Sequence, residues 1–322
     1  MFDYDQITQE VFADPTADFT FKRVFGTEKY KAATIGFLNS LIRDHRIVDV
    51  KFLSSELIGD TGDSRKAYID VLCEDDCGEK FIVEMQKARQ EHFRERAVFY
   101  ASKLISMMPP QGRSWDYSLS PSYVIAFLNF EMRQLGPAGD IPEDCYLLHY
   151  VTRDLSRGTK MPGSTEYYFL GIKDFNRLGR EPADYPEKWL YLLGRTRFLR
   201  EIPAGYGDSD VFGTYFEACK RAGFNREEEQ SYIKDMMNEW DIANAKREAC
   251  ERARAEGVAE GKAEGKAEGL AEGKAEGLAE GEAKGRAESL AEVAKNLLSL
   301  GIDVDTIAKC TGLDIKSIDA LK

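Results

Sequence analysis

The stretch from Lys66 to Gln86, KAYIDVLCEDDCGEKFIVEMQ, decides the fold. Residues 67–73 and 80–86 have the apolar, β-branched composition of strands, and the polar insert EDDCGE between them predicts a hairpin turn. Pairing of the two strands brings Asp70 close to Glu84, although a bulge would change the register. The sequence therefore predicts a β-hairpin that can bring two acidic side chains together.

The second strand of this hairpin has two different faces, because successive side chains of a strand point to opposite sides. Phe81, Val83 and Met85 form an apolar face that suits a core. Glu84 and Gln86 are left on the opposite face. Aspartate is disfavoured in strands, and a half-buried carboxylate without a partner is costly, so these acidic side chains need an explanation.

Two explanations of the acidic pair remain open. In the first, Asp70 and Glu84 form salt bridges with Lys66, Lys22 or Arg96. In the second, the two carboxylates converge on a hard cation such as Mg²⁺, which takes oxygen ligands and needs only one or two protein carboxylates. A metal held in this way activates water and neutralises charge on a scissile phosphate.

The segments on either side of the hairpin predict an α/β fold with a mixed sheet flanked by helices. Residues 19–43 are expected to form a helix that breaks near Gly26, and Pro109-Pro110 ends a second helix. The expected elements are helices at 19–43 and 90–108 and strands at 50–57, 67–73, 80–86 and 122–130. The expected buried face of the first helix comprises Phe21, Val24, Phe25, Ile35, Leu38, Leu41 and Ile42.

Asp70 followed by Glu84-Met85-Gln86 resembles the Asp…Glu-x-Lys signature of the PD-(D/E)XK nuclease superfamily, with glutamine in the lysine place. Two further segments, DFTFKRVFGTEKYKAATIGFLNSLI (18–42) and RERAVFYASKLI (94–105), resemble the Rpn family of recombination-promoting nucleases and transposases. The segments PSYVIAFLNF, CYLLHYVTRD and EKWLYLL and the Gly-Glu-rich repeat near the end are also typical of that family. The resemblance implies a restriction-endonuclease-like fold.

The resemblance also implies roles for four residues. Asp70 and Glu84 match the metal ligands, which would hold Mg²⁺ or Mn²⁺. Gln86 stands where a lysine normally orients or activates the attacking water. Asp18, on the first helix, matches an acidic position that often completes the catalytic site.

Gln86 departs from the superfamily pattern, because a neutral amide cannot supply the positive charge of an ammonium group. Either another lysine substitutes or the site is slow or specialised. Lys66 lies on the strand face of Asp70, and Lys22 lies one helical turn after Asp18, so both are candidates. Glutamine at this place is usual in the Rpn family and does not indicate a lost activity.

The formal net charge of -12 argues at first sight against a nucleic-acid partner. The charge is uneven, however: residues 226–322 hold 15 basic and 22 acidic residues and so account for -7 of it. Residues 87–113 hold six basic and two acidic residues and begin directly after Gln86. Phosphate contacts need local positive charge, so this stretch predicts DNA contacts, although a solvated helix face is the plain alternative. The predicted DNA-binding residues are Lys87, Arg89, Arg94, Arg96 and Tyr100.

The chain divides by composition into four parts: a nuclease-like domain (1–225), a charged amphipathic helix (226–254), an AEGx repeat (255–287) and a small helical unit (288–322). The helix has an apolar stripe, which predicts a core contact or an oligomer contact. The last part resembles a helix-turn-helix unit but lacks a basic recognition helix, so packing or homo-oligomer formation explains it better than DNA binding. The stripe comprises Ile233, Met236, Met237, Trp240 and Ala243.

The AEGx repeat places a glycine at every fourth position from 257 to 285. Four residues turn about 400° on an α-helix, so the glycine stripe drifts by about 40° per repeat and no fixed apolar seam forms. Each glycine costs about 1 kcal/mol of helix stability, whereas the intervening Ala, Glu, Lys and Leu favour a helix. We expect a solvated helix or a hinge-like spacer. Its function would be reach or helix–helix contact, and a tolerated low-complexity insertion without a function is an equal alternative.

Several classes are excluded or disfavoured by composition. Cys73 and Cys77 are the only close pair among six cysteines, so the spacing predicts no structural zinc site. No apolar run is long enough to span a membrane, and the acidic start does not resemble a signal peptide, so a cytoplasmic protein is expected. The sequence therefore predicts a Mg²⁺-dependent DNA endonuclease linked to recombination or transposition. The alternatives are a non-catalytic DNA-binding or assembly protein and a nuclease acting on RNA or phage DNA.

Overall fold

A computed structural model describes residues 7, 9–57, 67–108, 116–136, 141–207 and 209–321, with the main chain alone at positions 57 and 67. The chain forms two compact units, Met1–Asp241 and Ile242–Lys322. The long helix α8 (Arg226–Ser299) contributes its first sixteen residues to the first unit and the rest to the second. Each unit is described by itself below.

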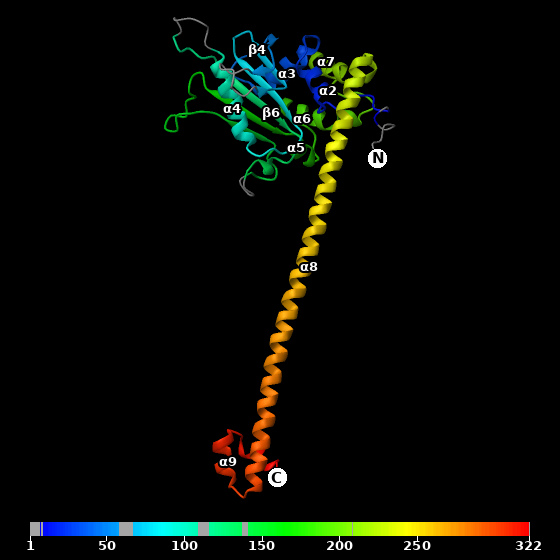
Figure 1. Ribbon diagram of the computed structural model, residues 1–322. Coiled ribbons are helices and arrows are strands. Elements are labelled where there is room, and N and C mark those ends of the chain that lie inside the picture. The colour runs from blue at the N-terminus through cyan, green and yellow to red at the C-terminus, as the bar shows by residue number, and fades with distance from the viewer. Residues whose placement is uncertain are drawn as a thin grey trace, which may run out of the picture. The chain divides into compact units, whose positions relative to one another are not determined.

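The first unit is built on a six-stranded mixed sheet in the order β1-β4-β5-β6-β8-β7. Figure 1 labels β4 and β6 of this sheet. The pairs β5–β6 and β6–β8 are parallel, and the other neighbours are antiparallel. This confirms the predicted mixed sheet. The strands are β1 (Val50–Phe52), β4 (Val71–Asp75), β5 (Lys80–Gln86), β6 (Ser122–Leu128), β7 (Leu147–Tyr150) and β8 (Thr165–Gly171).

Two of the expected strands are interrupted. The segment expected as one strand over 50–57 forms β1 and, after a break, β2 (Glu56–Leu57). The first hairpin strand likewise divides into β3 (Ala67–Tyr68), which pairs with β2, and β4, which pairs with β5. The chain therefore joins the main sheet at Val71, directly after Asp70, which is one of the two acidic residues of the predicted hairpin.

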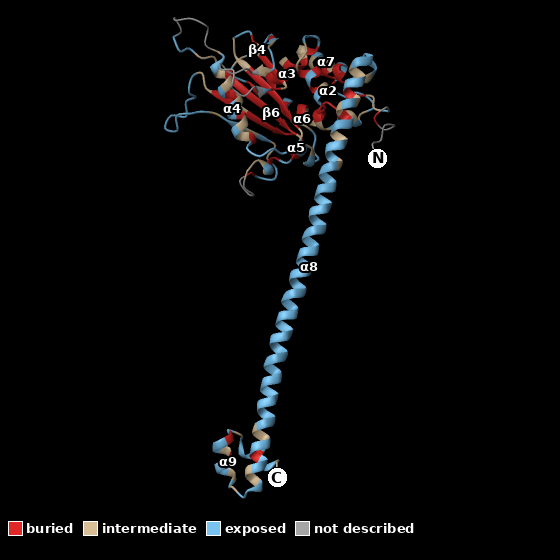
Figure 2. Cartoon of the chain, in the orientation of Figure 1, coloured by how far each residue is buried: buried red, intermediate tan, exposed pale blue. Residues whose placement is uncertain are grey.

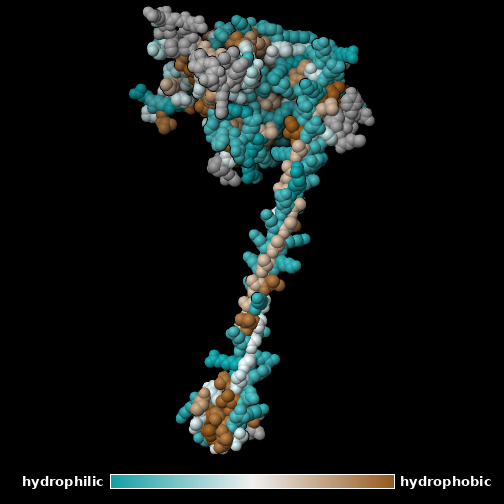
Figure 3. Space-filling model, in the orientation of Figure 1, coloured by the Kyte–Doolittle hydropathy of each residue, from teal (hydrophilic) through white to brown (hydrophobic). Residues whose placement is uncertain are grey.

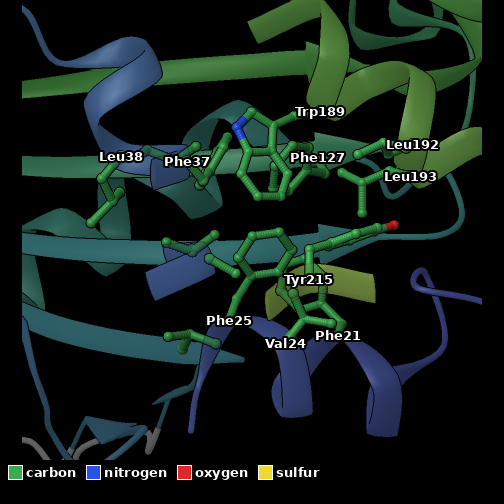
Figure 4. Close-up of a cluster of buried hydrophobic side chains, with 14 of the residues drawn as sticks. Phe21, Val24, Phe25, Phe37, Leu38, Phe127, Trp189, Leu192, Leu193 and Tyr215 are labelled. Carbon is green, nitrogen blue, oxygen red and sulfur yellow. The ribbon is translucent and has the colours of Figure 1, made fainter. Parts of the chain in front are cut away.

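Four helices cover one face of the sheet: α2 (Asp18–Phe25), α3 (Lys31–Leu41), α6 (Tyr185–Arg195) and α7 (Asp210–Cys219). Their apolar side chains meet those of the sheet in an aromatic core (Figure 4). The ring of Phe37 lies 4.7 Å from Phe127 of β6 and 5.8 Å from Trp189, measured between centroids. Such ring pairs add to the burial of large apolar surface, so this face fixes α2 against the sheet.

The helix α4 (Phe93–Ser106) covers the opposite face. Its buried residues Ala97, Ala101 and Leu104 pack with Ile82 of β5 and Val124 of β6. Because Ile82, Glu84 and Gln86 share a strand face, the acidic side of β5 points toward α4. The remaining elements of this unit are η1 (Glu28–Tyr30), η2 (Met132–Leu135), α5 (Ile172–Arg177), η3 (Thr196–Phe198) and η4 (Arg221–Gly223).

The start of α8 packs on the first unit through a different stripe from the predicted one. Tyr232 and Met236 are buried, whereas Met237 is 47% exposed. Polar contacts explain the difference: the Tyr232 hydroxyl donates to Glu10 at 2.6 Å and accepts from the backbone N–H of Asp14 at 3.0 Å. The predicted stripe contained only strongly apolar residues and so omitted Tyr232, whose hydroxyl group is held by these polar contacts.

In the second unit, α8 continues as a helix through the repeat region 255–287, and its residues there are exposed (Figure 2). Apart from the backbone of the helix itself and the adjacent residues, a methyl group built on any of the eight repeat glycines would meet no atom within 4 Å. Apolar side chains gather only near the end of this unit, where α9 (Val304–Thr311) and α10 (Ile315–Asp319) pack on the last turns of α8 (Figure 3). No helix among the described residues is long and apolar enough to cross a membrane.

The short helices at the end begin and stop as their local sequence requires. Asp303 and Asp314 cap the N-termini of α9 and α10 by accepting from the backbone N–H of the third following residue. Gly312 ends α9 with a φ of 73°, a conformation that glycine adopts without strain. Ile318 of α10 is buried, whereas Ile315 of the same helix is 48% exposed.

Candidate active site

The ladder between β4 and β5 opens where two acidic side chains face each other. Val71 pairs with Val83, so the next cross-strand pair would be Asp70 and Glu84. Like charges directly opposite in a sheet are destabilising, and here each carboxylate instead accepts from the other strand's backbone. The N–H of Asp70 donates to Glu84 Oε1 at 3.1 Å, and the N–H of Met85 donates to Asp70 Oδ2 at 2.8 Å. The two side chains thus replace the ladder and are fixed side by side.

The electrostatics of this pair disfavour two negative charges. Glu84 is 4% exposed, and burial together with the charge of Asp70 raises the pKa of Glu84 well above its usual range. Burial also raises the pKa of Asp70, against the opposing effects of the Met85 N–H and the Lys22 ammonium group. A divalent cation between the carboxylates would remove this repulsion, so the residues fit a hard metal ion.

Lys22 lies between Asp18 and Asp70 on the exposed side of this pair. Its Nζ is 2.8 Å from Asp18 Oδ1 and 4.0 Å from Asp70 Oδ1. Burial favours the neutral amine, but the contacts with Asp18 and Asp70 outweigh burial and raise the pKa of Lys22. The structure therefore places a protonated lysine beside the acidic pair.

Gln86 connects a guanidinium group to the acidic pair. Its Nε2 donates to Glu84 Oε2 at 2.9 Å, and its Oε1 accepts from Arg96 Nη2 at 2.6 Å. Arg96 also lies over the rings of Phe93 and Tyr100 at 5.1 and 5.6 Å. A positive charge thus acts on Glu84 through a neutral amide, without an ion pair between the two.

The other predicted DNA-binding residues, Lys87, Arg89 and Arg94, have no contact with the acidic pair among the interactions of the described residues. Lys87 forms an ion pair with Glu239 of α8. Arg94 lies over the ring of Tyr150 at 6.0 Å, and its Nε is buried without a hydrogen-bond partner among the described residues. Arg89 is exposed in the connection between β5 and α4. Of the five predicted DNA-binding residues, Arg96 therefore contacts the site through Gln86, and Lys87 and Arg94 have other partners.

A cleft of about 690 Å³ opens beside these residues and is lined by Asp18, Lys22 and Asp70 together with one side of α8. Asp235 of α8 also accepts from the backbone N–H of Phe19 at 2.7 Å, in the first turn of α2. Sequence reasoning missed the contribution of α8, because residues 226–254 were assigned to a separate segment. The α8 residues of the cleft are Glu228, Ser231, Lys234, Asp235 and Asn238.

Asp18 does not join Asp70 and Glu84 in one group of metal-ligating atoms. Asp18, Asp70 and Glu84 do not all lie within 4.8 Å of one another, because Asp18 is held by Lys22. Asp18 therefore contacts the acidic pair through a lysine. The other proposed substitute lysine, Lys66, lies outside the described residues.

The first unit is a mixed sheet with helices on both faces, and the open end of its β4–β5 hairpin presents two acidic side chains. These features define the class of PD-(D/E)XK nucleases. The chain belongs to the PD-(D/E)XK nuclease family transposases, whose family model matches residues 15–249. This confirms the resemblance seen in the sequence, and the matched region includes the part of α8 that lines the cleft. Nucleases of this class generally use divalent metal ions.

Comparisons with the curated proteins and with the solved structures gave no match.

Proposed function

We propose that the chain is a Mg²⁺-dependent endonuclease that hydrolyses phosphodiester bonds of DNA, with Asp70 and Glu84 as the metal ligands and Mn²⁺ as an alternative ion. One observation carries the proposal: the β4–β5 ladder opens so that two carboxylates face each other, each held by the other strand's backbone. The nearest positive charges are Lys22, whose Nζ lies 4.0 Å from Asp70 Oδ1, and Arg96, which reaches Glu84 only through Gln86. A bound cation completes this arrangement.

The chain's own residues would position the reactants. When bound, a divalent ion activates water and neutralises charge on the scissile phosphate. Lys22, held by Asp18, would supply the positive charge that the superfamily lysine normally provides. Gln86 would keep Glu84 in place, since its amide links that carboxylate to Arg96. Asp18 then acts as a positioning residue for Lys22.

The DNA backbone would lie along the start of α4 and the preceding connection. Arg89 is exposed there, and Arg94, Arg96 and Tyr100 follow on the helix. Lys87 would contribute once its ion pair with Glu239 is exchanged for phosphate. Contacts of this kind read no sequence and weaken with salt, so a broad substrate range is expected. The family name motivates a role in transposition or recombination.

A plasmid-nicking assay in Mg²⁺ and in Mn²⁺ tests the proposal. We would compare wild type with Asp70→Asn and Glu84→Gln, which keep an acceptor for the backbone N–H groups and remove only the charge. Glu74→Gln is the matched control, because Glu74 lies on β4 of the same hairpin and pairs with Lys80 at 3.2 Å. We expect nicking by wild type and Glu74→Gln and none by the two site variants.

Equal nicking by all four proteins would remove the proposed site. DNA binding without cleavage in any divalent cation would favour a non-catalytic DNA-binding or assembly protein. An RNA substrate in a parallel assay separates a ribonuclease from a deoxyribonuclease, because the same metal chemistry serves both.

A further inference from the structure

A second group of metal-ligating side chains lies at the other end of the β4–β5 hairpin. His45 comes from the segment between α3 and β1, and Asp75 and Cys77 come from the end of β4 and the following turn. The antiparallel pairing of β1 with β4 sets Val50 opposite Asp75 and so brings the segment before β1 to this turn. The three residues are neighbours in the fold although His45 is thirty positions away in the sequence.

The ligand atoms of these three side chains all lie within 4.8 Å of one another, and they form the one such group among the described residues. His45 Nε2 is 2.7 Å from Asp75 Oδ2. A tetrahedral zinc ion with imidazole, carboxylate and thiolate ligands keeps those ligand atoms about 3.5 Å apart. Small side-chain movements would therefore admit an ion, and water would take the fourth position.

The aspartate of this group is held in place by the turn. Its Oδ1 accepts from the backbone N–H groups of Cys77 at 3.0 Å and Glu79 at 2.8 Å, which leaves Oδ2 for His45. The side chain of Asp75 is fully buried, whereas Cys77 is exposed. The group is therefore anchored on its inner side and open to solvent at the thiol.

A carboxylate also faces the outer nitrogen of the imidazole. Glu79 Oε2 lies 3.7 Å from His45 Nδ1, and this buried oxygen has no hydrogen-bond partner among the described residues. Metal-binding histidines usually donate their second N–H to such a carboxylate, which fixes the ring and its tautomer. Tyr123 also hydrogen-bonds the Glu79 carboxylate, and a small movement would let Oε2 accept the Nδ1–H of a histidine whose Nε2 binds a metal.

We propose that His45, Asp75 and Cys77 bind a zinc ion at the turn of the hairpin, with Glu79 as the carboxylate behind the histidine. An ion pair between His45 and Asp75 would account for two of the three side chains but leaves the exposed thiol without a role. Nitrogen, oxygen and sulfur together suit Zn²⁺ rather than Mg²⁺, which prefers oxygen ligands alone. This site is independent of the proposed nuclease activity.

Cobalt titration of the full-length reduced chain tests the proposal, because Co²⁺ replaces Zn²⁺ and gives a thiolate charge-transfer absorption. We expect one equivalent of Co²⁺ with this absorption in wild type, and Zn²⁺ should displace it. Cys77→Ser should abolish the absorption, and His45→Gln should weaken Co²⁺ binding at least tenfold. Thermal unfolding without metal checks that each variant is folded.

Two controls separate this site from the rest of the chain. Cys310→Ser removes an exposed cysteine of the second unit and should keep the absorption. Asp70→Asn combined with Glu84→Gln should also keep it, whatever the nicking assay shows. Absence of the absorption in wild type, or its persistence in Cys77→Ser, would overturn the proposal.

Discussion

Two buried glutamates of the first unit, Glu187 and Glu84, are held in opposite ways. They are 3% and 4% exposed. Glu187 of α6 accepts from both terminal nitrogens of Arg180, and these bonds lower the pKa of Glu187 to about 2. Glu84 of β5 has no such ion pair among the described residues and faces another carboxylate, so its pKa is raised. The buried acid with a direct cation partner thus has a lowered pKa, and the buried acid that faces a carboxylate has a raised one.

The largest expected effect separates the two glutamates by activity. Glu84→Gln should lower kcat/KM for plasmid nicking by at least about 10³-fold, roughly 4 kcal/mol, because it removes a proposed metal ligand. Glu187→Gln should leave the rate per folded molecule within about threefold. Measuring both rates against the folded fraction checks this contrast, and equal losses in the two variants would break it.

The next effect separates them by stability. Glu187→Gln should lower the free energy of unfolding by about 2–3 kcal/mol at pH 7, since it breaks charged hydrogen bonds at a buried site. A depressed pKa stabilises the fold above the unfolded value of about 4.5, so the loss should shrink as pH falls from about 4.5 toward 2. Urea unfolding at several pH values measures this, and a loss that does not vary with pH would contradict it.

Arg96 acts on Glu84 through the amide of Gln86, whereas Arg180 bonds Glu187 directly. Replacing Arg96 measures how much this indirect contact contributes to nicking. Arg96→Met should lower nicking about tenfold, or roughly 1.4 kcal/mol, because Gln86 loses the guanidinium group that orients it. Arg133→Met is the control, since Arg133 pairs with exposed Glu143 away from the site. If Arg96 positions Gln86, kcat should fall. If Arg96 only contacts phosphate, KM should rise instead. No change in either parameter would exclude both roles.

The smallest effect is a gain in stability. A raised pKa means that the native state is penalised as pH rises above the unfolded value of 4.5. Glu84→Gln should therefore match wild type near pH 5 and exceed it by up to about 1 kcal/mol at pH 8, when EDTA is present. Thermal unfolding at the two pH values measures the difference. A variant less stable than wild type at pH 8 would show that the carboxylates do not repel each other.

Much of the first unit could be predicted because its information is local. The alternation of β5 put Phe81 and Val83 in one core and Glu84 on the other face, as the structure confirms. The register could not be predicted, because it depends on the turn, and it alone decides that Asp70 stands opposite Glu84.

Contacts between distant segments could not be predicted either. The contribution of α8 to the cleft was missed, since composition changes abruptly near Arg226 and suggested a boundary there. The group of His45, Asp75 and Cys77 was missed for the same reason, because it arises from strand pairing and has no sequence spacing to reveal it.

The glycine repeat of α8 has a consequence for local unfolding. Its eight glycines weaken the helix by about 8 kcal/mol relative to alanine if their effects add, and no packing against other parts of the chain offsets this. Amide hydrogens at 255–287 should therefore exchange far faster than those of β5 and β6. A non-specific protease should cut the repeat first. Such a cut would release the nuclease-fold unit and the C-terminal helices as two fragments.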